Sequence, residues 1–193
     1  MASPAETRVG RPPKVDDAGV ATRDRLLAAA VASCVEHGFE GATVADIAQR
    51  ADVSAPAIYN HFGGRVELLV AAGRAALSRL GRPRSAGRPA AAEVVRAFLA
   101  PEFAPTRRLL AELHLAVPRH PEVATLLAGW HTEQATAWRP TAGRDRDATV
   151  KAFFALLLGL CQIESLDALP AAPAAVRRRA EALATVLYPE ELP

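Results

Sequence analysis

Apolar residues recur at intervals of three and four along most of this 193-residue chain, and no stretch alternates apolar and polar residues as a strand does. The first clear case begins at Thr22, a residue type that caps helices, with Asp24 in the first turn. Its buried stripe comprises Leu26, Leu27, Ala30, Val31 and Cys34. Gly38 suits the left-handed residue that ends a helix, and Phe39 can fold back onto the last turn. The sequence therefore predicts an all-α fold.

Helical spacing and the prolines between the patterns divide the chain into about nine predicted helices. Proline cannot continue a helix, so prolines 105, 118, 121, 140, 170 and 173 separate the later patterns. The predicted helices span residues 22–38, 43–51, 55–61, 65–80, 91–100, 105–117, 121–138, 148–166 and 174–187. Residues 1–20 hold three prolines and several polar breaks, which predicts a flexible N-terminal arm.

Composition limits the possible classes of function without selecting one. Half of the residues are hydrophobic and the formal net charge is only +2. Residues 1–65 hold seven Lys and Arg against eight Asp and Glu, so a DNA-binding role would rest on a few well-placed cations. The longest apolar run, residues 152–161, is too short to cross a membrane, and the N-terminus lacks a secretory signal pattern. We therefore expect a cytoplasmic protein, with Cys34 and Cys161 as buried core thiols.

The most informative segment is residues 43–62, TVADIAQRADVSAPAIYNHF. Thr43 and Asp46 have the spacing of a capping box, with Asp in place of the usual Glu. Pro56 is tolerated only in the first turn of a helix, so a new helix must begin near Ser54. A small residue, Ala48, would let the two short helices pack closely. This arrangement is typical of a helix-turn-helix motif.

The second helix of this motif would have an inner and an outer face. Val53 and Ile58 would anchor it to the hydrophobic core. The outward residues are then Ser54, Ala55, Pro56, Ala57 and Asn60, at the positions where a recognition helix meets base edges in the major groove. Their small size favours contact with a thymine methyl group and close backbone approach.

From Thr22 to about Leu80 the chain resembles the DNA-binding domain of the TetR (tetracycline-repressor-like) family of transcriptional regulators. The resemblance is carried by residues 26–30, 37–39, 43–44, 47–48 and 58–62, followed by Arg65 and residues 68–69. It implies a DNA-binding domain over residues 21–81, with the helix-turn-helix motif at about 43–62. It also implies a helical ligand-binding and dimerisation domain over residues 91–193.

The resemblance assigns DNA contacts to particular residues. Tyr59 and His61 fall where the family contacts phosphates, and Arg65 replaces the family's usual Lys, still able to neutralise a phosphate. Thr43 and Val44 lie at a helix N-terminus, which also favours phosphate. Asp52 departs from the usual Gly of the turn, although Asp tolerates a left-handed conformation.

The arm offers one further DNA contact. Arg11 lies in VGRPPK, which resembles the Gly-Arg-Pro core that enters a narrow minor groove. A terminal tail without a role is the alternative interpretation.

The C-terminal half offers candidates for effector binding and for dimerisation. Its aromatic and histidine residues could line an apolar ligand pocket or fill an ordinary core, and they are Phe98, Phe103, His114, Trp130, His131 and Trp138. The eighth predicted helix is apolar nearly all round, so it needs cover on several sides. With the ninth helix it would form the family's four-helix interface of a homodimer.

Three functional classes differ in the motifs that they require. The sequence contains no nucleophile elbow, phosphate loop, zinc-protease motif or paired-cysteine site, so we predict neither an enzyme nor a bound cofactor or metal. The preferred interpretation is a dimeric repressor that a small apolar ligand releases from a palindromic double-stranded DNA operator. A helix-turn-helix dimer without a ligand, either architectural or regulated by a partner protein, remains the alternative.

Overall fold

The computed structural model describes residues 22–80, 90–137, 146–164 and 173–187. Within these ranges the chain forms nine α-helices and one short 3-10 helix, and no strand, which confirms the all-α prediction. The helices are α1 (Thr22–Gly41), α2 (Val44–Arg50), α3 (Ala55–Phe62), α4 (Arg65–Leu77), α5 (Ala91–Phe98), α6 (Ala104–Ala116), α7 (Pro121–Ala137), α8 (Arg146–Glu164) and α9 (Pro173–Leu187). The 3-10 helix, η1 (Pro101–Phe103), precedes α6. The predicted arm lies outside the described residues.

Most helix ends lie within three residues of their predicted positions, and α1 shows why one of them differs. Gly38 has the expected positive φ, 77°, but helical hydrogen bonding resumes beyond this kink and continues to Gly41. Phe39 is buried, and its backbone N–H donates to Glu112 Oε2 on α6 at 3.3 Å. This long-range bond holds the turn after Gly38 against α6. The helix is interrupted at Gly38, where the sequence predicts its end, and a further helical turn follows it.

Helices α1 to α4 surround one apolar core. Helix α1 packs on α2, α4 and α6, and α3 packs on α2 and α4. The fully buried side chains at the centre of these helices include Leu26, Cys34, Ile47, Ile58 and Leu68. Burial raises the pKa of the Cys34 thiol to about 12. The prediction of a buried core thiol is therefore confirmed for Cys34, and also for Cys161 in α8.

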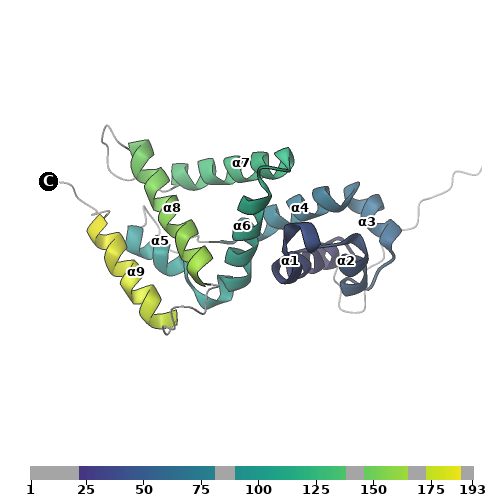
Figure 1. Cartoon of the computed structure of the whole chain (residues 1–193), viewed down its shortest axis with the longest axis horizontal. Helices are drawn as coiled ribbons and strands as arrows, with labels where there is room; N and C mark the ends of the chain where they lie inside the picture. Colours follow the sequence, from purple (N-terminus) through teal and green to yellow (C-terminus); the bar gives the residue numbers. More distant parts are fainter. Residues whose placement is uncertain (1–21, 81–89, 138–145, 165–172, 188–193) are drawn as a thin grey trace, which may run out of the picture.

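Helices α5, α8 and α9 lie on the opposite side of α6 from α1 to α3, so the molecule is elongated, with α2 and α3 near one end and α9 at the other (Figure 1). Helix α6 contacts α1, α4, α7 and α8 and so lies at the centre. Helix α5 packs on α9, with an ion pair between Arg96 and Glu181 at 3.0 Å. None of the described helices is long and apolar enough to cross a membrane.

Helix α4 also packs closely on the helices beyond it. A Cβ atom added at Gly73 would lie 3.0 Å from Leu113 Cδ1 and 3.1 Å from Leu126 Cδ2, so only glycine fits without moving these neighbours. At the end of the same helix, the Leu77 carbonyl accepts a hydrogen bond at 3.1 Å from the indole Nε1 of Trp130 on α7. Both ends of this contact are buried. The position of α4 is thus tied to α6 and α7.

Candidate nucleic-acid interface

The helix pair α2–α3 is organised by its caps and its turn. The hydroxyl of Thr43 accepts a hydrogen bond from the Asp46 backbone N–H at 3.2 Å, as predicted for the N-cap of α2. The Asp46 carboxylate accepts two hydrogen bonds from Arg50 Nε instead of returning to Thr43, so only half of the expected capping box forms. Such a cap contributes about 1 kcal/mol to helix stability.

Asp52 adopts the left-handed conformation that the turn requires, with φ of 52°. It is the only non-glycine residue with positive φ in the described part of the chain. The following N–H, of Val53, bonds back to the Ala48 carbonyl at 3.0 Å and closes the turn. The replacement of the usual Gly by Asp therefore leaves the turn geometry intact, as expected for a residue type that tolerates this region.

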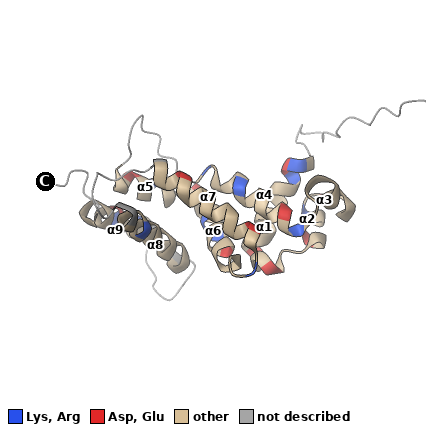
Figure 2. Cartoon of the chain, turned by 90° about the horizontal axis from the view of Figure 1, so that it is seen from above, with Lys and Arg blue, Asp and Glu red and all other residues tan. Residues whose placement is uncertain are grey.

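Helix α3 has the two faces that its sequence predicts, except that Ala55, predicted to face outward, packs partly against the core. Ile58 is fully buried and Val53 is half-buried, which anchors the helix to the core. The exposed side chains are Ser54, Pro56, Tyr59, Asn60 and His61, while Ala55 and Ala57 are half-buried. Helix α3 contains no Lys, Arg, Asp or Glu, and its ribbon is tan throughout in Figure 2. The exposed residues form an uncharged surface from which hydroxyl, amide and imidazole groups project.

At the amino end of α3, the hydroxyl of Ser54 does not cap the helix. Ser54 occupies the N-cap position with an extended backbone, but its side chain makes no capping hydrogen bond. Pro56 has no backbone N–H that could donate to the Ser54 hydroxyl. The Ala57 N–H already donates to the Ser54 carbonyl at 2.9 Å. Among the described residues the hydroxyl has no partner, so it is available to a ligand in front of the helix.

Arg65 is engaged within the protein, which the sequence did not predict. Its Nη1 donates to the Phe39 carbonyl at 2.6 Å and to the Ala42 carbonyl at 3.4 Å. Its Nη2 donates to Glu40 Oε2 at 3.3 Å, and the guanidinium lies 5.5 Å from the centre of the Phe39 ring. The side chain fastens the start of α4 to the end of α1, in addition to any role toward phosphate.

Glu40 connects this contact to the loop between α6 and α7. Its Oε1 accepts a hydrogen bond from His120 Nε2 at 2.9 Å, and the His120 ring packs on Phe39 with 4.8 Å between ring centres. The bond from His120, with the nearby charge of Arg65, lowers the pKa of the Glu40 carboxyl. Glu40 therefore joins side chains from the two halves of the molecule.

Two other arginines lie near the helix pair. Arg50 pairs with Asp46 and with Glu36, both at 2.8 Å, and these acceptors raise the pKa of its guanidinium. Arg23 on α1 is exposed, and its guanidinium carbon lies 5.1 Å from the centre of the Phe62 ring on α3. Sequence reasoning missed Arg23 because no local spacing links it to a residue 39 positions away.

Of the predicted effector-binding residues that the structure describes, three lie together. His114, Trp130 and His131 are in contact, with ring centres 5.2 Å apart for the two histidines and 5.0 Å apart for Trp130 and His131. Phe98 is buried in the core, and Phe103 lies half-buried in η1. Trp138 of this set, like Arg11 of the DNA-contact set, lies outside the described residues.

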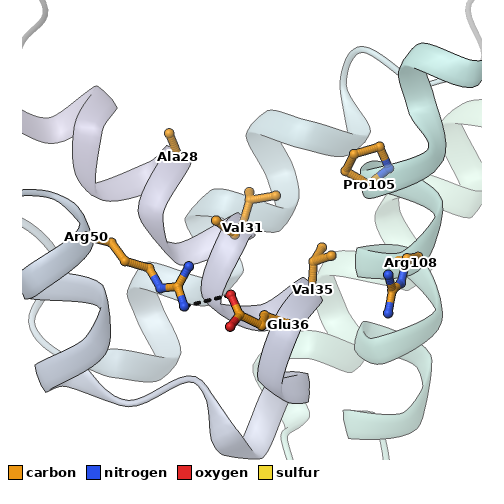
Figure 3. Close-up of a pocket in the computed structure, with 8 residues that line it drawn as sticks. Ala28, Val31, Val35, Glu36, Arg50, Pro105 and Arg108 are labelled. Atoms are coloured by element: carbon orange, nitrogen blue, oxygen red, sulfur yellow. Dashed lines mark hydrogen bonds and ion pairs between the residues drawn. The ribbon is translucent and has the colours of Figure 1, made fainter.

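An open groove of about 490 Å³ lies between α1, α2 and α6 (Figure 3). Its wall is mostly apolar, with Arg50 and Glu36 on one side and Arg108 on the other. Its lining residues are Ala28, Val31, Ala32, Val35, Glu36, Arg50, Pro105 and Arg108. None of the predicted effector-binding residues that the structure describes lines this groove.

Comparison with known structures agrees with this arrangement of helices. The chain superposes with a TM-score of 0.70 on a Rhodococcus sp. protein assigned to the TetR family of transcriptional regulators, over 86% of this chain and 98% of that one, at 23% identity. The chain also superposes on GusR of Salmonella enterica with a TM-score of 0.62, over 86% of this chain and 95% of that one, at 21% identity. The TM-score is again 0.62 for the multidrug binding protein EbrR complexed with imidazole, over 90% of this chain and 97% of that one, at 24% identity. No curated protein matches the sequence significantly.

At the level of sequence, a family model described as bacterial regulatory proteins, tetR family, matches residues 26–72. This segment begins within α1 and ends within α4, so it contains the whole α2–α3 pair. The matched segment is therefore similar to the tetR family of bacterial regulatory proteins, and the chain shares the fold of these solved structures.

Proposed function

We propose that the chain is a transcriptional repressor that binds a palindromic DNA operator as a homodimer and leaves it when a small apolar molecule binds. Residues 1–20 would act as an arm, residues 21–81 as the DNA-binding domain, and residues 91–193 as the effector-binding and dimerisation domain. The single observation that carries the DNA-binding part is the exposed, uncharged face of α3 at the end of an elongated molecule.

The assignment of DNA contacts follows from this face. Base edges would meet Ser54, Ala55, Pro56, Ala57 and Asn60, whose small side chains allow the backbone to approach closely. Phosphates would be bound by Tyr59, of which 57% is exposed, by His61 and Arg65, and by the amino end of α2 at Thr43 and Val44. Arg11 would reach the minor groove. Arg23 joins this set because it is exposed beside α3.

Exposed apolar side chains on α8 and α9 support the homodimer. These are Ile163 on α8 and Val176, Leu183, Val186 and Leu187 on α9, each more than 40% exposed. Exposed large apolar side chains that share one face of a helix, as the spacing of Val176, Leu183 and Leu187 implies, are typical of a protein interface. A two-fold dimer would present two copies of α3, so the operator must contain inverted half-sites about one helical turn, or a multiple of it, apart.

Release from DNA by an effector requires that effector binding changes the affinity of the DNA-binding surface for the operator. Helix α4 connects them, because Arg65 lies at its DNA end and Leu77 contacts Trp130 at the other. A coupling of about 1–3 kcal/mol lowers operator affinity 5- to 150-fold, and linkage requires that the operator weakens effector binding by the same factor. Equal effector affinities with and without operator would rule out this coupling.

The proposal is tested by selecting random DNA fragments on the purified full-length protein and sequencing them. We expect an enriched inverted repeat, and light scattering at micromolar concentration should give twice the mass of one chain. Enrichment of a single unrepeated half-site, together with a monomer in solution, would contradict the dimeric operator complex. The double variant Leu183→Glu, Leu187→Glu should shift the mass toward the monomer and lower operator affinity, whereas Leu115→Glu, at an exposed leucine of α6, is the control.

A further inference from the structure

Two histidines face each other between α6 and α7. His114 Nε2 and His131 Nε2 are 3.0 Å apart, and His114 Nδ1 lies 2.8 Å from the carbonyl oxygen of Leu110. At this distance the two imidazoles form a hydrogen bond with each other. One ring must then donate and the other must accept.

The Leu110 carbonyl determines which ring donates. A carbonyl oxygen can only accept, so His114 Nδ1 must carry the proton in this bond. Neutral His114 then has a lone pair at Nε2, which accepts a hydrogen bond from His131 Nε2–H. Neutral His131 must in turn have a lone pair at Nδ1. This atom is buried and has no hydrogen-bond partner among the described residues.

The surroundings of His131 favour the neutral form of its ring and bury its Nδ1 atom, which has no hydrogen-bond partner among the described residues. Burial, reinforced by the neighbouring His114, lowers the pKa of His131 to about 4. The Trp130 ring lies 5.0 Å and the Phe154 ring 4.9 Å away, centre to centre. With both rings neutral, the cluster presents a single unsatisfied acceptor in an aromatic setting. A buried acceptor without a partner is unfavourable, and a molecule that supplies a donor removes this disadvantage.

We propose that His131 Nδ1 is the polar recognition point for the effector, and that the effector is a flat apolar molecule carrying an uncharged N–H or O–H donor. This inference rests on the proposed function, because it names the ligand class of that same site. Phe154 on α8 is only half-buried, so its ring is the neighbour that can move to admit the molecule. A carboxylate has no proton to donate at neutral pH and would be excluded.

The choice of molecule can be tested with pairs of equal shape that differ only in the donor. We would use indole with benzofuran, and 2-naphthol with 2-fluoronaphthalene, on the full-length protein labelled with ¹⁵N-histidine. Long-range ¹H–¹⁵N spectra should first show the Nδ1–H form for His114 and the Nε2–H form for His131. The donor member of at least one pair should bind about tenfold more tightly than its match, equivalent to about 1.4 kcal/mol. The same molecule should shift the His131 Nδ1 signal.

Two variants separate recognition by this atom from general apolar binding. His131→Gln keeps an N–H near the position of Nε2 but removes the acceptor at Nδ1, so the affinity ratio within the pair should fall to about one. His37→Gln changes an exposed histidine on α1 and should leave the ratio unchanged. If His131→Gln does not fold, a shift of the His131 Nδ1 signal in the unmodified protein still shows whether the molecule binds at this atom.

The inference is overturned if His131 has the Nδ1–H form. It is also overturned if donor and non-donor members bind equally, or if no donor molecule binds at millimolar concentration. These outcomes are distinct from failure of the proposed function, which is judged by operator selection without any small molecule. A protein that binds the donor members selectively but no DNA would keep this inference and refute the repressor.

Discussion

Replacement of Arg65 tests the largest difference between the sequence-based and the structural descriptions. Arg65→Ala removes a charged donor from the Phe39 carbonyl at 2.6 Å and an ion pair with Glu40. A hydrogen bond to a charged group contributes about 1.5–3 kcal/mol and an exposed ion pair about 0–1 kcal/mol. Because the side chain is only 24% exposed, we expect a loss of about 2–3 kcal/mol. For a chain of this size that lowers Tm by about 4–12 °C.

The assay is thermal unfolding followed by circular dichroism, with Arg108→Ala as the control. Arg108 is exposed and has no partner among the described residues, so its removal should leave Tm unchanged. A Tm for Arg65→Ala within about 1 °C of the unmodified protein would refute the structural role, since even the lower estimate predicts more.

Arg65→Lys then separates stability from DNA binding. Lysine keeps the charge but cannot reach a carbonyl and a carboxylate with two nitrogens, so it should restore only part of the lost stability. If Arg65 also neutralises a phosphate, Arg65→Ala lowers the slope of log affinity against log salt by about one, and Arg65→Lys restores it. An unchanged slope in Arg65→Ala would leave the residue with its structural role alone.

Three further predictions concern local contacts. Thr43→Ala should cost about 1 kcal/mol in urea unfolding through loss of the cap, and an unchanged midpoint would contradict that bond. Gly73→Ala should be less favourable than Gly129→Ala by at least about 1 kcal/mol, because a Cβ meets two leucines at the first site and nothing within 4 Å at the second; equal values would refute the close packing. The folded state lowers the pKa of Glu40 below its usual 4.5, so its contribution is present above that pH and is lost as the pH falls. The stability difference between the protein and Glu40→Gln should therefore be present above about pH 4.5 and shrink below that pH, and a difference that does not shrink there would refute the bond from His120.

Features encoded within a few neighbouring residues could be predicted from the sequence. The cap at Thr43, the left-handed Asp52 and the inward Ile58 each depend on residues at most five positions away, so spacing alone reveals them. The family resemblance then supplied the DNA-facing positions around them.

Contacts between distant residues could not be predicted in this way. Arg65 meets a carbonyl 26 positions away and Phe39 meets Glu112 across 73, and no periodicity encodes such pairs. The unpaired nitrogen of His131 likewise emerges only after α6 and α7 are packed, because it depends on how His114 uses its own two nitrogens.

The hydrogen bond from Trp130 to the Leu77 carbonyl gives this protein a built-in optical reporter. The chain has only two tryptophans, so Trp138→Phe would leave Trp130 as the single emitter. The indole N–H of Trp130 donates to the carbonyl of Leu77, the last residue of α4, and its ring lies against His131. The fluorescence emission of Trp130 therefore depends on both neighbours. A swing of α4 that breaks this bond would change the emission wavelength in real time, without any dye attached. The motion that links the two halves of the molecule could thus be followed in a stopped-flow fluorimeter.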